Sequence, residues 1–249
     1  MTGTIYILWL RQIKRALRSK ARIIGSLGQP VLFLVALGFG FGPIFQKAGA
    51  GNYIEFLAPG IISMGILFTS MFFGIETIWD KKFGFLKETL VAPVSRTAIM
   101  IGRTLGGATM SVFQGIIVLL ISMIAGFKIN EWGMLPLTII FMALIAILFT
   151  ALGTAIASLL EDMHGFQLIM NFLVMPLFFL SGALFPLDGV PKALETISHL
   201  NPLAYGVDGI RGTLTGATHF GIATDLAVLA IITMLLLGIG SYLFKKIQV

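Results

Sequence analysis

Six long apolar stretches constrain the fold of this chain more than any other feature of its sequence. Each has about 20 or more residues, enough for a helix to cross the roughly 30 Å hydrocarbon core of a bilayer. Only helices and closed barrels satisfy their backbone hydrogen bonds in lipid, and these stretches are too long and unbroken for barrel strands. The sequence therefore predicts an all-α membrane protein with six transmembrane helices, at about 23–45, 54–78, 98–125, 135–160, 165–185 and 222–244.

Composition narrows the class further. Of the 249 residues, 57% are hydrophobic and 11% are charged, whereas soluble domains carry roughly 25% charged residues. No segment outside the apolar stretches is long enough to bury its own core, so residues 1–249 are predicted to form a single transmembrane domain. The absence of cysteine excludes disulfides, thiolate metal sites and thiol redox chemistry.

The basic residues predict the orientation. Placing the N-terminus inside makes 1–22, 79–97, 161–164 and 245–249 cytoplasmic, and 46–53, 126–134 and 186–221 external. Most of the 17 Lys and Arg residues then lie inside or at the inner end of a span; the external ones are Lys47, Lys128, Lys192 and Arg211. This asymmetry satisfies the positive-inside rule and predicts a multi-pass plasma-membrane (inner-membrane) protein with both termini in the cytoplasm. The net charge of +6 thus serves as an orientation signal, and no nucleic-acid partner is predicted.

Residues 4–22 have the pattern of a basic amphipathic helix. One face carries Arg11, Lys14, Arg15, Arg18 and Arg22; the opposite face carries Ile5, Trp9, Ile13, Ala16 and Leu17. Such a helix is expected to lie in the membrane plane with its bases near anionic lipid headgroups. The alternative is an ordinary positive flank of the first span that happens to be helical.

Residues 79–97 are the longest polar interruption between the first five apolar stretches. Within them, Phe83–Val91 alternates bulky apolar with charged residues, which predicts a short amphipathic helix. Pro93 ends it because proline lacks the backbone N–H that the helix needs. We expect a soluble partner to dock on this segment.

The external segment 186–221 differs from the other loops. A turn at Pro186 precedes two helical patterns of about ten residues each, separated by Asn201-Pro202. Both are too short to cross a bilayer of about 30 Å. They are expected either to dip into the outer leaflet as a re-entrant hairpin or to lie flat on its surface.

Glycines and one proline predict local features of the spans. Gly102, Gly106 and Gly107 lie on one side of the third span, where small residues let helices approach closely; alternatively they reflect only the abundance of glycine in membrane helices. Pro176 predicts a kink or a broken turn in the fifth span.

Ionisable residues are scarce in the middle of the spans, which argues against an ion-driven transporter. Arg103, about one turn inside the third span, is expected to extend to the cytoplasmic headgroups, or else to pair with Glu76 or Asp80. Asp208 and Arg211 are expected to form an exposed helical pair of little energetic value.

Catalytic and metal-binding patterns are weak. The chain lacks the glycine-rich Gly-Lys-Ser/Thr loop that binds nucleotide phosphates, so it is not expected to hydrolyse ATP alone. His164 is predicted inside, but His199 and His219 outside, which leaves no metal site. Ser181 lies outside any Gly-x-Ser-x-Gly elbow, which argues against a serine hydrolase.

Four stretches together are similar to a known family. The chain resembles the membrane-spanning subunit of ABC type-2 exporters, in the branch of daunorubicin-resistance permeases and nodulation-type lipo-oligosaccharide exporters. The matching stretches are Gln29–Phe33 with Gly40–Gly42, Tyr53–Gly60, residues 84–96 with Gly102–Arg103, and FLSGALFPLDGVPKALETISHLNPLAYGVDGIRG at 179–212. Their order and spacing cover nearly the whole length.

The resemblance implies a non-enzymatic permease that dimerises and is driven by two copies of a separate ATP-binding subunit, which binds the ATP and Mg. The ATPase would dock on the coupling residues, with Phe85 and Leu86 as apolar contacts and Lys87 and Glu88 at the rim. These residues are Phe83, Gly84, Phe85, Leu86, Lys87, Glu88, Leu90 and Val91. The external helices, with Pro186, Asn201, Pro202, Tyr205 and Arg211, would close the exit.

The substrate class follows from the apolar character of the spans. We expect an amphipathic molecule, either a hydrophobic drug-like compound or a lipid-linked glycan, because aromatic side chains rather than fixed charges are available along the path; the chain has 21 Phe. The alternative function is a secondary transporter or channel that works without ATP.

Overall fold

The computed structural model describes residues 2–47, 51–91, 93–160 and 162–245, except for the side chains of Leu90 and Lys245. Every regular element within these residues is helical. In chain order they are α1 (Thr2–Arg18), α2 (Lys20–Lys47), α3 (Tyr53–Lys82), α4 (Phe85–Val91), α5 (Arg96–Ile124), η1 (Trp132–Met134), α6 (Leu135–Leu159), α7 (Met163–Ile169), the π-helical turn η2 (Met170–Val174), α8 (Met175–Phe179), α9 (Lys192–Leu200), α10 (Pro202–Thr215) and α11 (Ile222–Lys245).

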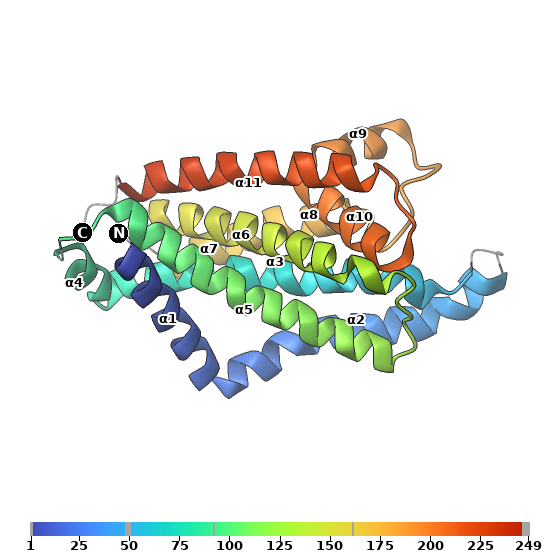
Figure 1. The fold of residues 1–249 in the computed structure, drawn as a ribbon, viewed down its shortest axis with the longest axis horizontal. Helices are drawn as coiled ribbons and strands as arrows, with labels where there is room; N and C mark the ends of the chain where they lie inside the picture. Colours follow the sequence, from blue (N-terminus) through green and yellow to red (C-terminus); the bar gives the residue numbers. More distant parts are fainter. Residues whose placement is uncertain (1, 48–50, 92, 161, 246–249) are drawn as a thin grey trace.

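The long helices run side by side along one axis of an elongated bundle (Figure 1). The described part of the chain begins and ends at the same end of this bundle, beside α4; we call this the α4 end. The short helices α9 and α10 lie at the opposite end, the α9 end. Residues 246–249, part of the predicted cytoplasmic tail, lie outside the described residues.

The centre of the bundle is α3. Leu57, Ile61, Ile62 and Leu67 on this helix are fully buried, and its largest helix–helix contact is with α6. Gly74 and Gly153 sit at this contact, where a Cβ on Gly74 would lie 2.4 Å from the carbonyl carbon of Gly153. The two backbones therefore touch directly, as small residues permit in membrane helices.

Five described helices are long and apolar enough to cross a membrane: α2, α3, α5, the helix Trp132–Leu159 and α11. They correspond to five of the six predicted spans. This assignment rests on helix length and composition.

The sixth predicted span, 165–185, is not confirmed. The helix there runs over Met163–Phe179, shorter than the other five, and the chain then turns through Gly182, whose φ of +71° is typical of glycine. The predicted disruption at Pro176 is confirmed: α-helical bonding changes to the π-helical turn η2 directly before it. The proline ring clashes with the carbonyl four residues back, and a wider turn relieves that clash.

The predicted helix 4–22 is wrong at its C-terminal end. Helical structure breaks at Ser19, so Arg22 belongs to α2, which leaves the break in a different direction (Figure 1). Leu17, assigned to the apolar face, is 49% exposed. Of the other residues on that face, Ala16 is buried and Ile5, Trp9 and Ile13 are partly buried.

Gly102 and Gly106 confirm the predicted close helix packing, and the partner helix is α1. A Cβ on Gly102 would lie 2.9 Å from the Leu8 Cβ, and one on Gly106 would lie 2.5 Å from the Gln12 Cβ. Gly107, on the other side, meets Phe73 of α3. Thus α1 packs closely against α5 at two successive turns.

Candidate functional site

The chain leaves α3 through a tight turn that positions α4. The Trp79 and Phe83 rings stack with centroids 5.3 Å apart and planes tilted by 7°. Gly84 then adopts a φ of +80°, a conformation that glycine tolerates best. Its carbonyl accepts the Glu88 amide at 3.3 Å, which closes the first turn of α4.

The two apolar residues predicted to contact a partner point in different directions. Leu86 is fully buried in a cluster with Leu8, Ile99, Met100, Ala151 and Phe244, so it anchors α4 to the bundle. The expectation that Leu86 is free for a partner is therefore wrong. Phe85 is 50% exposed, as expected for a contact residue, and its ring centroid lies 5.9 Å from the Arg11 guanidinium carbon.

The exposed side of residues 83–91 combines apolar and charged groups. Phe83 and Val91 are exposed, as are Lys87 and Glu88. The side chain of Leu90 lies outside the described residues. This surface has the composition of a small docking site: aromatic and aliphatic contacts with charges at the edge.

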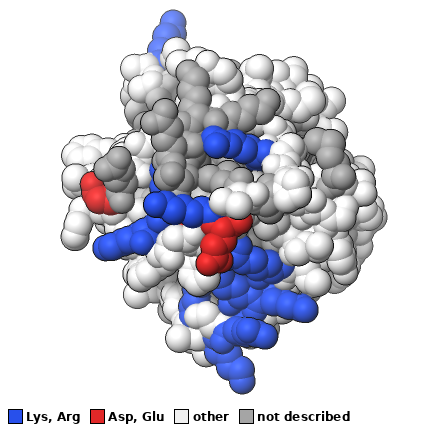
Figure 2. Space-filling view, turned by 90° about the vertical axis from the view of Figure 1, so that its left-hand side faces the viewer, with Lys and Arg blue, Asp and Glu red and all other residues white. Residues whose placement is uncertain are grey.

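The α4 end is strongly basic. Figure 2, which views this end, shows far more Lys and Arg than Asp and Glu. Arg11, Lys14 and Arg18 of α1 contribute to it, and Lys14 and Arg18 are exposed. Arg15, predicted to lie on the same face, instead turns toward α3 and donates to Asp80 at 3.0 Å.

Arg15 belongs to a network of five charged side chains. Arg103 donates to Asp80 Oδ2 at 2.6 Å and to the Thr77 hydroxyl at 3.2 Å. Arg22 donates to Glu76. Both carboxylates and Arg103 are buried, so the network joins α1, α2, α3 and α5 in the interior.

This network corrects the favoured expectation for Arg103, which does not extend to the headgroups; the alternative pairing with Asp80 is the one observed. Burying a charge is tolerable only where it is paired, and Asp80 provides the pair. The sequence signal was available, because Glu76 and Asp80 are four residues apart and share one face of α3. The roles of Arg15 and Arg22 were missed because both were assigned to an amphipathic helix.

At the other end of the bundle, α9 and α10 differ in burial. Most of α9 is exposed, whereas α10 is almost wholly buried against α3, α6 and α11. Of the two predicted placements, the surface arrangement therefore fits α9 alone. Glycine makes this insertion possible, since a Cβ on Gly209 would lie 2.2 Å from the Phe141 ring.

Asn201 and Pro202 form the junction between these helices. The Asn201 side chain accepts the Leu203 amide at 3.0 Å and donates to the Leu177 carbonyl at 2.6 Å. Pro202 begins α10, where its missing N–H costs nothing. Tyr205 donates to the His199 carbonyl at 2.8 Å, which holds α9 against α10. Pro186 is exposed in the preceding turn.

We expect Asn201→Ala to lower the free energy of unfolding by about 1–2 kcal/mol, since a helix cap and a second hydrogen bond are lost together. Denaturant titration of the purified chain in mixed micelles measures the change. Thr196→Ala, on exposed α9, is the control and should stay within about 0.5 kcal/mol of the wild type. Equal stability of Asn201→Ala and the wild type would contradict the capping role.

Arg211 connects α10 to α3 and to the turn after α8. Its guanidinium lies 4.2 Å from the Phe56 ring centroid and donates to the Gly182 carbonyl at 2.8 Å. Burial lowers the pKa of Arg211 to about 10, which still leaves it charged at neutral pH. The expected exposed Asp208–Arg211 pair is wrong: Asp208 is buried and accepts the amides of His219 and Phe220 instead.

Metal chemistry finds no support within the described ranges. No group of three or more His, Cys, Asp or Glu residues lies close enough together there to hold an ion.

Known proteins align with nearly the whole chain. Residues 4–215 match the family model described as ABC-2 type transporter. A putative transport permease, ycf38, of Cyanophora paradoxa is 30% identical, with 98% of this chain and 88% of that protein aligned. Nodulation protein J of Rhizobium leguminosarum bv. viciae is 26% identical over 97% of this chain and 91% of its own.

A third relative is the inner membrane transport permease YadH of Escherichia coli (strain K12), 26% identical over 90% of this chain and 88% of its own length. Family model and relatives agree, and both cover the segments that carry α4 and α10. The chain therefore belongs to the ABC-2 type transporter family of integral membrane permeases.

Proposed function

We propose that this chain is the membrane subunit of an ATP-driven exporter and that a separate ATP-binding subunit docks on its coupling segment, Phe83–Val91. Family membership supports the general activity, because ABC-2 permeases usually work with such a subunit. Nucleotide and Mg would be bound by that partner.

The observation that carries the proposal is the two-sided character of α4. Leu86 fixes one side into the bundle, while Phe83, Phe85 and Val91 stay exposed on the other. An exposed apolar surface on a rigidly held helix favours a protein partner, since contiguous exposed apolar patches rimmed by polar residues mark protein–protein interaction sites. Lys87 and Glu88 would then form the polar edge.

We infer an even number of crossings from the placement of the chain ends. Both ends of the described chain lie at the α4 end, although five helices have the length of a span. A sixth crossing would bring both ends to one side of a membrane, and Met163–Phe179 with the following turn is the segment that would supply it. The basic α4 end would face the cytoplasm.

The external route would be closed by α9 and α10, near Pro186, Asn201, Pro202, Tyr205 and Arg211. The substrate would be amphipathic, either a drug-like compound or a lipid-linked glycan, and the relative named nodulation protein J favours the nodulation-type exporter branch. Two copies of the chain would pair, each with one ATP-binding subunit.

Phe85→Asp should abolish co-purification with the ATP-binding subunit, because a charge would enter the centre of an apolar contact. The measurement is the ratio of the two subunits after affinity purification from membranes. Trp132→Asp is the matched control: it is an exposed aromatic in η1, at the opposite end of the long helices from α4. It should leave the ratio unchanged.

Leu86→Asp, unlike Phe85→Asp, should lower the amount of folded chain, because it places a charge in a buried cluster. An unchanged subunit ratio for Phe85→Asp would refute docking on α4. Substrate movement by the purified chain without any ATPase would favour a secondary transporter or channel.

A further inference from the structure

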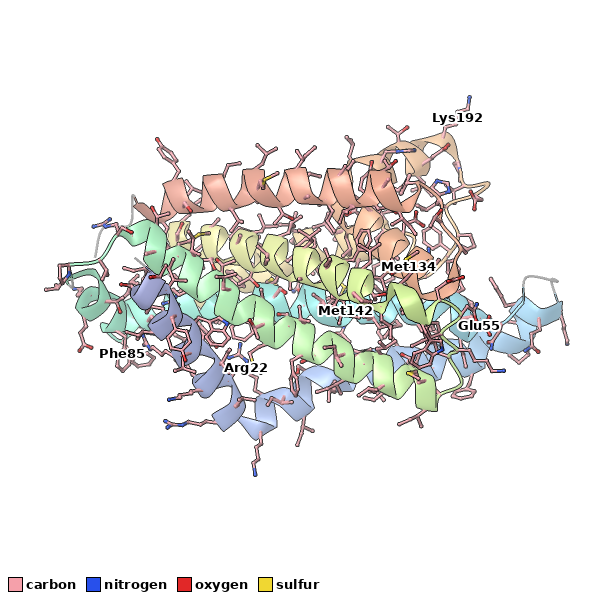
Figure 3. All side chains as sticks on the ribbon, in the orientation of Figure 1. Arg22, Glu55, Phe85, Met134, Met142 and Lys192 are labelled. Carbon is pink, nitrogen blue, oxygen red and sulfur yellow. The ribbon has the colours of Figure 1, made fainter. Side chains whose placement is uncertain are left out.

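A cavity of about 510 Å³ opens beside the charged network, between α1, α2, α3 and α5. Arg15, Arg22 and Glu76 line its end nearest α4, together with Trp79. Apolar walls are provided by Phe72 and Phe113, both exposed on the outer surface of the bundle. Figure 3 shows Arg22 at the bend between α1 and α2, facing α3 and α5. One chain thus forms a site that is charged at one end and apolar along its length.

The length of the cavity follows from the residues of α3 that line it. They extend from Trp79 to Thr69, which is about 15 Å at 1.5 Å per residue. Ser26 and Gln114 close the far end, where the Ser26 hydroxyl and Gln114 Oε1 are 2.6 Å apart. Ser26 and Gln114 therefore satisfy each other's hydrogen bonds. The apolar part of the cavity, between this end and the charged end, is suited to a hydrocarbon chain.

The charged end has unused hydrogen-bonding capacity of both kinds. Arg15 and Arg22 each use one Nη1 for a carboxylate and remain partly exposed; each guanidinium has five N–H donors. Glu76 Oε2 is buried and accepts no hydrogen bond from the described residues, with Arg15 Nη1 3.9 Å away. A ligand that both accepts and donates hydrogen bonds would satisfy this end.

The basic residues around the cavity favour an anionic lipid as its ligand. The first acidic residue of the chain is Glu55, so α1 and the start of α2 carry only bases, including Arg11, Lys14, Arg18 and Lys20. Positive potential at a membrane surface attracts anionic lipids, by about 1 kcal/mol per base near the surface. Trp79, at the mouth of the cavity, is a residue typical of the headgroup level.

We propose that this cavity is a binding site for phosphatidylglycerol. Arg15 and Arg22 bind its phosphate, a headgroup hydroxyl donates to Glu76 Oε2, and one acyl chain lies between Phe72 and Phe113. The inference goes beyond the proposed function, because the site is formed by one chain and needs neither an ATPase nor a transported substrate.

Lipid retention measured by native mass spectrometry tests the proposal on the full-length chain released from micelles. Phosphatidylglycerol should be retained at least about tenfold better than phosphatidylcholine, because no choline ammonium offsets its phosphate charge beside the two arginines and because its hydroxyl donates to Glu76 Oε2. Phosphatidylethanolamine, whose ammonium could reach Glu76, is the second comparison. Equal or better retention of either zwitterionic lipid would overturn the choice of an anionic lipid.

Two variant pairs identify the site. Arg15→Gln/Arg22→Gln should lose the preference for phosphatidylglycerol, whereas Arg18→Gln/Lys20→Gln, with the same charge change on exposed bases outside the cavity, should keep it. Gly25→Leu fills the cavity, since Gly25 lines it and a Cβ there meets nothing within 4 Å. Its control is Gly28→Leu, on the same helix in equally open space but outside the lining.

Loss of retention in Gly25→Leu but not in Gly28→Leu supports the site even if the double arginine variant fails to fold. Equal loss in Arg18→Gln/Lys20→Gln and Arg15→Gln/Arg22→Gln would mean that the whole basic surface, rather than the cavity, attracts the lipid. Unchanged retention in Gly25→Leu would refute the acyl-chain placement. Displacement by glycerol phosphate alone would show that the apolar walls contribute nothing.

Discussion

Replacing Asp80 with alanine is expected to lower the free energy of unfolding by about 3–5 kcal/mol, the cost of leaving a buried partner charge unpaired. Asp80 is 2% exposed and accepts hydrogen bonds from Arg15 at 3.0 Å and Arg103 at 2.6 Å. Without it, the buried Arg103 keeps the Thr77 hydroxyl as its remaining observed partner. Denaturant titration in mixed micelles, followed by tryptophan fluorescence, measures the loss.

A double variant separates unpaired charge from lost packing. Asp80→Ala/Arg103→Leu should recover much of the stability, because removing both members of a buried pair is often neutral. Glu88→Ala, on the exposed side of α4, is the control and should change stability by less than about 0.5 kcal/mol. If the double variant is no more stable than Asp80→Ala, the cost does not arise from the arginine left behind.

Gly74→Ala is expected to disrupt the contact between α3 and α6. The new Cβ would lie 2.4 Å from both the carbonyl carbon and the carbonyl oxygen of Gly153. Backbone atoms cannot yield as a flexible side chain can, so the helices must separate, at a cost of about 1–3 kcal/mol or more. The measurement is the same titration, together with the fraction of chain that elutes as a single species in size-exclusion chromatography.

Gly40→Ala is the matched control for this substitution, because a Cβ there meets nothing within 4 Å. It should be neutral or slightly stabilising, since alanine favours the helix over glycine by up to about 1 kcal/mol. Equal behaviour of the two variants would contradict the direct backbone contact at Gly74.

The sequence predicted the long helices and the family well, because the length of an apolar stretch is set by contiguous residues. Local sequence also predicted two details of the spans: the spacing of Gly102 and Gly106 predicted close helix packing, and the missing N–H of Pro176 predicted the irregular turn. Five spans and the disrupted helix at Pro176 follow from such local patterns. The sequence could not name α1 as the helix that packs on the glycines, since that partner depends on the bend at Ser19.

The candidate sites were predicted less well, because their contacts join distant segments. An amphipathic pattern identifies α4 but does not say that Leu86 faces inward while Phe85 faces outward, a choice made by the packing of Leu8 and Ile99. Likewise α10 has charged and small residues that suit a surface helix. Its burial depends on the backbone partners of Asp208 and Arg211, which lie in the segments after α10 and after α8.

The anchoring of α4 determines where a mechanical load can travel. Leu86 is wedged against Ile99 and Met100 at the start of α5, and the contacts at Gly102 and Gly106 leave no room for slip between α5 and α1. A force applied at Phe85 is therefore expected to reach the first turns of α5 and, through them, α1. The rigid unit of α1 and α5 would end at Ser19, where helical structure breaks before α2 begins.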